Sequence, residues 1–80
     1  MIAFFDKDLS VLVDMRSKIM KEVDYIWCFV YFDNRTNVGE KLVIANEFDN
    51  KLSDKKLNEV LDVMECYCSE NLLEFQYSVL

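Results

Sequence analysis

The 80-residue chain has no histidine, no proline and a single glycine, Gly39. Histidine is the commonest general base and a frequent ligand of transition metals, so its absence removes the usual centre of hydrolytic or metal-assisted catalysis. One glycine cannot build a glycine-rich phosphate loop. We therefore expect a protein that is not an enzyme, with no catalytic residues, no metal and no cofactor.

Long apolar runs are also missing. The longest one, residues 25–32, is far shorter than the roughly 20 residues that a transmembrane helix needs. The N-terminus lacks the basic region and apolar core of a signal peptide. Three cysteines, an odd number, do not make a disulfide framework. These features favour a cytoplasmic protein with no membrane association.

Basic residues are scarce: nine Lys and Arg stand against fifteen Asp and Glu, which gives a net charge of −6. The longest basic run is the pair Lys55-Lys56. Because binding to a phosphate backbone depends on clustered cations, this composition disfavours direct nucleic-acid binding. The 52% hydrophobic content indicates a folded chain, and its length fits a single domain over residues 1–80.

Hydrophobic periodicity divides the chain into six elements. We expect a strand over 2–5, a helix from Asp6 to about Asp24, a strand over 25–32, a return strand over 41–48, a helix from Ser53 to about Ser69 and a last strand over 72–80. Asp6 or Asp8 would cap the first helix and Ser53 the second. Asn71 is the expected left-handed residue at the end of the second helix.

The order β-α-β-β-α-β indicates an α+β fold. With one central hairpin over 25–48 and right-handed crossovers, it fits the split-βαβ, ferredoxin-like pattern. That pattern is a two-layer sandwich in which one four-stranded antiparallel sheet carries both helices on one face. The alternative is a sheet with two helices in which the first strand does not pair.

The stretch "VMECYCSENL", residues 63–72, resembles a metal or redox site because it holds two cysteines among acids. On a helix with 100° per residue, Cys68 lies on the apolar face with Leu61 and Met64, and Cys66 points to the opposite side. The two thiols therefore cannot bind one ion or form a disulfide without unwinding the helix. We interpret Cys68 and Cys28 as core residues.

The second strand is aromatic on one face and aliphatic on the other. The first set is Tyr25, Trp27, Phe29 and Tyr31, and the second is Ile26, Cys28, Val30 and Phe32. We assign the aromatic set to the open face, because smaller residues suit the space under helices. A contiguous exposed set of this kind is typical of an interaction site, unless the monomer buries it in another way.

Two further features suggest partner contacts. Arg16 falls within the apolar stripe of the first helix, either as a side chain whose stem packs while its charge reaches water or as a guanidinium held by Glu47, Asp33 or a partner's carboxylate. The second helix also carries an acidic face around Cys66. Its acids are Glu59, Asp62, Glu65 and Glu70.

These observations favour a small protein that works by binding another protein. The concrete form is an inhibitor, antitoxin, immunity or phage anti-defence factor, for which a phage or mobile-element origin would be suitable. Its acids would attract a basic, nucleic-acid-binding partner and mimic phosphate charge. One alternative is a homodimeric ligand-sensing regulatory domain. The other is an RNA-binding sheet, which needs more cations than this chain offers.

Overall fold

The computed structural model describes residues 1–31, 40–46 and 51–79 of the chain. Within these ranges the elements follow the order expected from the sequence. They are β1 Ile2–Lys7, α1 Leu9–Glu22, β2 Ile26–Tyr31, β3 Glu40–Asn46, α2 Asp54–Glu70 and β4 Ser78–Val79.

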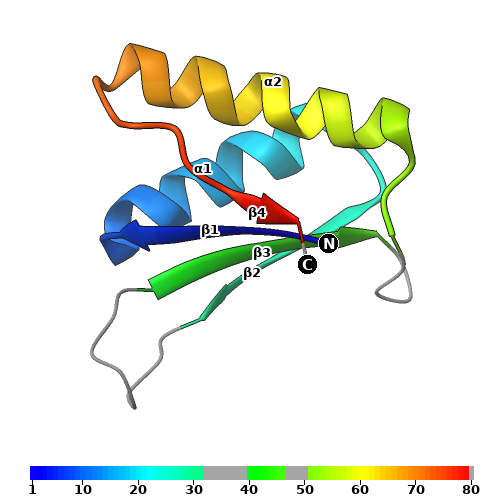
Figure 1. Ribbon diagram of the computed structural model, residues 1–80, viewed down its shortest axis with the longest axis horizontal. Coiled ribbons are helices and arrows are strands. Elements are labelled where there is room, and N and C mark those ends of the chain that lie inside the picture. The colour runs from blue at the N-terminus through cyan, green and yellow to red at the C-terminus, as the bar shows by residue number, and fades with distance from the viewer. Residues whose placement is uncertain (32–39, 47–50, 80) are drawn as a thin grey trace.

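The four strands form one antiparallel sheet in the order β2-β3-β1-β4. Both helices lie on the same side of this sheet (Figure 1). The α+β class predicted from the sequence is therefore confirmed, with a four-stranded antiparallel sheet and two helices. Since β1 and β2 are each antiparallel to β3, which lies between them, β1 and β2 run parallel to one another.

The core fills the space between the helices and the sheet. Its fully buried side chains come from β1, α1, β3 and α2: Ile2, Phe4, Leu12, Met15, Ile19, Leu42, Ile44, Val60, Met64 and Cys68. Burial of each large apolar side chain stabilises the fold by about 1.5–3 kcal/mol. Neither helix in the described part of the chain is long and apolar enough to span a membrane.

Both helices begin at a side-chain cap. The Asp8 carboxylate accepts a hydrogen bond from the Ser10 amide at 2.9 Å, so Asp8 is the cap of α1 rather than Asp6. The Ser53 hydroxyl accepts from the Lys56 amide at 3.3 Å, as expected for α2. Each cap satisfies one amide that has no partner inside its helix.

The C-terminus of α2 differs from the prediction by one residue. Asn71 has φ −103°, and Leu72 is the left-handed residue, with φ 55°. The Leu73 amide donates to the Cys68 carbonyl at 2.8 Å and the Leu72 amide donates to Ser69 at 3.4 Å. This pair of bonds is a Schellman motif, which requires its left-handed residue at the position that Leu72 occupies.

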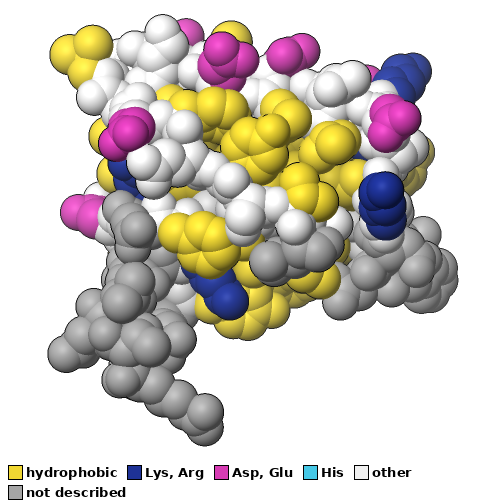
Figure 2. Space-filling model, viewed as in Figure 1, with side chains coloured by type: hydrophobic (Ala, Val, Ile, Leu, Met, Phe, Trp, Pro, Cys, Tyr) yellow, Lys and Arg dark blue, Asp and Glu magenta, His cyan; other side chains and the backbone are white. Residues whose placement is uncertain are grey.

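The last strand is much shorter than the predicted strand over 72–80. Within the described part of the chain, β4 pairs with β1 only at Ile2 and Ala3. The reason is the path of the chain, which leaves α2 in the helix layer and descends to the sheet before β4 (Figure 1). On the way, Leu73 and Phe75 pack against the core, and a hydrophobic band lies between α2 and this segment (Figure 2).

Candidate functional site

The outer side of β2 carries a row of exposed aromatic side chains. Trp27, Phe29 and Tyr31 are 53%, 44% and 50% exposed, whereas Ile26 and Cys28, which alternate with them along the strand, are buried. Because the core residues face the helices, the three aromatic residues face the opposite side of the sheet. This is the orientation expected from the sequence. We call these three residues the aromatic face.

The neighbours across the sheet are smaller and mostly apolar. Ala45 lies opposite Trp27, Val43 opposite Phe29, and Lys41 opposite Tyr31. The Phe29 and Tyr31 rings are tilted, with centroids 6.2 Å apart. Half-exposed aromatic side chains of this size present roughly 300 Å² together, which is within the range of functional patches on monomers. It is less than half of the roughly 800 Å² per partner in a standard interface.

Tyr25, the fourth aromatic residue predicted for this row, is not part of it. It precedes β2 in a left-handed turn with φ 63°, and it is 88% exposed. Lys56 in α2 lies over its ring at 5.9 Å and donates to the Asp24 carbonyl at 2.9 Å. The turn ends the strand alternation before Tyr25, so the side chain points to the start of α2 instead of the aromatic face.

Arg16 has a partner that the sequence did not indicate. Its Nε donates a hydrogen bond of 2.9 Å to the backbone carbonyl of Cys28 in β2. The residue is exposed overall, in keeping with a side chain that packs along its stem. The acids considered as its partners, Glu47 and Asp33, lie outside the described residues. Arg16 therefore reaches the backbone of β2, the strand at the end of the sheet.

The acidic residues of α2 belong to a different surface. Asp62, Glu65 and Glu70 are exposed, and Glu59 is half-buried and 3.6 Å from the Lys56 ammonium. Acidic side chains are spaced along the upper rim of Figure 2, where α2 lies. The helix layer thus presents the acids, while the aromatic face is on the other side of the sheet. The structure does not join the two sets into one contiguous patch.

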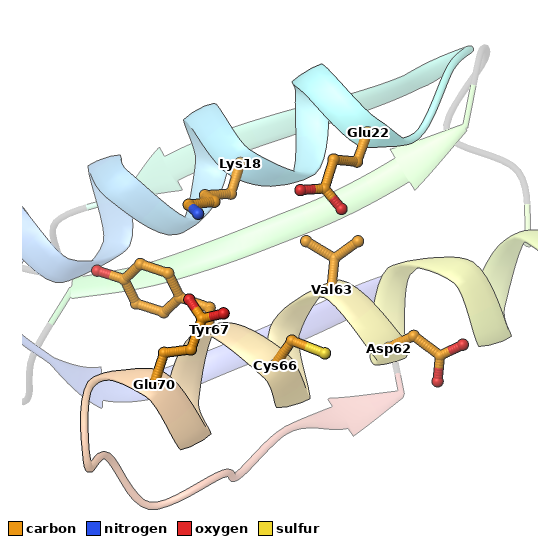
Figure 3. A pocket seen from close by; sticks show the side chains of 7 residues that line it. All are labelled: Lys18, Glu22, Asp62, Val63, Cys66, Tyr67 and Glu70. Carbon is orange, nitrogen blue, oxygen red and sulfur yellow. The ribbon is translucent and has the colours of Figure 1, made fainter.

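A shallow cleft of about 150 Å³ lies between α1 and α2 (Figure 3). Its lining is Lys18, Glu22, Asp62, Val63, Cys66, Tyr67 and Glu70. Tyr67 is the buried member of this lining, and burial first and the Asp14 carboxylate second raise the pKa of its phenol. Charges of both signs at the rim select no particular ligand.

The three cysteines lie as the sequence predicted, Cys66 and Cys68 on opposite sides of α2 and Cys28 in the core. Cys28 and Cys68 are buried and Cys66 is exposed. Burial raises the pKa of Cys28 to about 11 and also raises the pKa of Cys68, so both remain neutral thiols near pH 7. In the described part of the chain, no three acidic or sulfur ligands come close enough to hold a metal ion.

Comparison with known proteins finds no relative of this chain. No protein-family model matches the chain, and neither does any curated protein or solved structure that was searched.

Proposed function

We propose that this protein acts by binding another protein through the aromatic face, Trp27, Phe29 and Tyr31. The supporting observation is that these three neighbouring side chains remain about half exposed on a sheet face that carries neither helix. Trp and Tyr are enriched among the residues that dominate binding energy, because they bury a large rigid area at low entropic cost. Their combined area suits the centre of an interface whose rim comes from the neighbouring residues.

The partner we propose is basic, as a nucleic-acid-binding protein is. A net charge of −6 attracts such a partner at long range without requiring that every acid touch it. The acids of α2 then increase the association rate, and the aromatic face holds the complex. A factor of this kind is an inhibitor of the antitoxin, immunity or phage anti-defence type, which occupies its target instead of transforming it.

We also infer that the two layers form a ferredoxin-like sandwich. This inference is supported by the insertion of β3 between the parallel strands β1 and β2, and by the pairing of β4 with the far side of β1. The fold hosts many unrelated functions, so it gives no functional information by itself. The functional proposal therefore depends on the surface alone.

The test uses the tagged 80-residue chain as bait in a lysate of its natural host. The doubly substituted variant Trp27→Ala/Tyr31→Ala should lose the captured partner, since it removes most of the exposed ring area. A matched control, Leu9→Ala/Met20→Ala, removes two similarly exposed apolar side chains from α1 and should retain it. Capture by all three proteins, with unchanged circular dichroism, would show that the aromatic face is not the binding surface.

The role of charge is tested separately. The variant Asp62→Asn/Glu65→Gln/Glu70→Gln removes three exposed charges from α2 without touching the aromatic face. We expect a slower association rate and a weaker dependence on salt, with a dissociation rate close to that of the wild type. Complete loss of binding would instead place the contact on α2 and favour direct mimicry of phosphate charge.

A further inference from the structure

The outer edge of β2 is a place where a strand of another chain could pair with the sheet. Among the residues that the structure describes, β2 ends the strand order and pairs only with β3. Its sequence, IWCFVY, contains no charged residue and no proline. Six residues of high β-propensity without charge are the pattern that pairs with other chains when it lies at an exposed sheet edge. A monomer with this edge requires a feature that opposes pairing.

The contact of Arg16 identifies the backbone groups on that edge. The Cys28 carbonyl accepts from a side chain that reaches it from α1, so it points away from β3. Residues of an antiparallel strand alternate between facing their partner strand and facing away. Ile26 and Val30 therefore have the same orientation as Cys28. The amides and carbonyls of these three residues form the outer edge.

This edge is complementary to a second copy of itself. In the antiparallel register centred on Cys28, Ile26 lies opposite Val30 of the second copy, and Trp27 lies opposite its Phe29. Every such pair is apolar, and aromatic pairs across strands stabilise sheets. This register overlaps residues 26–30 of the two copies and places the two Cys28 residues opposite each other, where they would exchange two backbone hydrogen bonds.

Arg16 acts against this register at its centre. Its Nε already occupies the Cys28 carbonyl, which the second copy would need. Two-fold symmetry would also bring two guanidinium groups together beside the axis, and arginine stays charged at any pH a protein tolerates. Close like charges repel more strongly at a protein surface than in bulk water. We propose that Arg16 is an edge guard that prevents β2 from pairing with β2 of a second copy.

The packing of α1 holds the Arg16 side chain in position. Arg16 follows the buried residue Met15 and lies one turn after Leu12, which is also buried. These anchors fix the rotation of the helix over β2, so the side chain reaches the edge from a rigid support. Substitution of Arg16 should therefore open the edge without removing a core side chain.

The experiment compares wild type with Arg16→Ala and with Lys18→Ala. The control removes one positive charge from an exposed position of the same helix, away from the β2 edge. We expect Arg16→Ala to self-associate at least about ten-fold more tightly than the other two in sedimentation equilibrium, because each copy frees one carbonyl acceptor and the repulsion between the two guanidinium groups is removed. Equal association of all three proteins, with the fold intact, overturns the proposal.

Hydrogen exchange identifies the edge used. In the wild type, the outward amides of Ile26, Cys28 and Val30 should exchange faster than those of Trp27 and Phe29, which face β3. In associated Arg16→Ala, the three outward amides should become protected. Association without that protection means a different interface and refutes the guard. If Arg16→Ala does not fold, Arg16→Gln replaces it, because it removes the charge and keeps most of the stem. The wild type alone also tests the assignment of the edge. Equal protection of all five of its amides refutes that assignment.

Discussion

Replacement of Leu72 by glycine should stabilise the protein. Leu72 has φ 55°, and its side chain is 95% exposed, so a smaller residue loses almost no buried area. A residue with a β-carbon pays roughly 1–2 kcal/mol in this conformation, and glycine does not. The greater freedom of glycine in the unfolded chain reduces this gain in stability by roughly 0.5–1 kcal/mol. The expected net gain is about 0.5–1 kcal/mol, equivalent to a rise of about 2–8 °C in Tm for a domain of this size.

The assay is urea and thermal unfolding followed by circular dichroism. Leu72→Ala is the matched control, since it removes the side chain but keeps the β-carbon, and its stability should stay within about 0.5 kcal/mol of the wild type. A glycine variant no more stable than the alanine variant would refute the reasoning. That result would mean that the Schellman motif does not hold position 72 in the left-handed region.

Two further predictions concern stability. Ser53→Ala should destabilise the protein by about 1 kcal/mol in urea unfolding, because it removes the cap of α2, whereas Ser69→Ala near the other end should change little. Stability should also fall between pH 9 and 11. The pKa of buried Cys28 is raised from 9.0 to about 11, so the unfolded chain loses this proton first. The free energy of unfolding should fall by about 2–3 kcal/mol because of Cys28. In Cys28→Ala it should fall less steeply with pH than in the wild type. An identical decline in both proteins would assign the effect to other groups.

The partner-binding proposal and the edge-guard proposal can fail independently. The aromatic face tests depend on Trp27 and Tyr31, whose side chains leave the sheet on its open side. The edge tests depend on Arg16 and on backbone groups of β2. A variant of the aromatic face that loses the partner but does not self-associate contradicts neither proposal. An Arg16 variant that self-associates but keeps the partner contradicts neither proposal either.

Local sequence was sufficient for the element order and for which side of an element most of its residues face. Periodicity places Leu12, Met64 and Cys68 toward the core and Cys66 toward solvent, because a helix turns by a fixed angle per residue. Strand alternation likewise separates Trp27 from Cys28. The cap at Ser53 is likewise a local feature, and the sequence limits the cap of α1 to Asp6 or Asp8, of which the structure shows Asp8.

Tertiary structure alone decided the remaining features, because each depends on segments far apart in the chain. The partner of Arg16 is a backbone carbonyl twelve residues later, and backbone groups leave no trace in a sequence pattern. The predicted strand over 72–80 has the right alternation, but the chain descends from α2 to the sheet, so of residues 72–79 only Ser78 and Val79 pair with β1. Tyr25 leaves the aromatic row because a left-handed turn starts β2 one residue later than its composition suggests. The sequence by itself thus determined which residues are apolar, aromatic or capping, and packing between elements determined which of them meet.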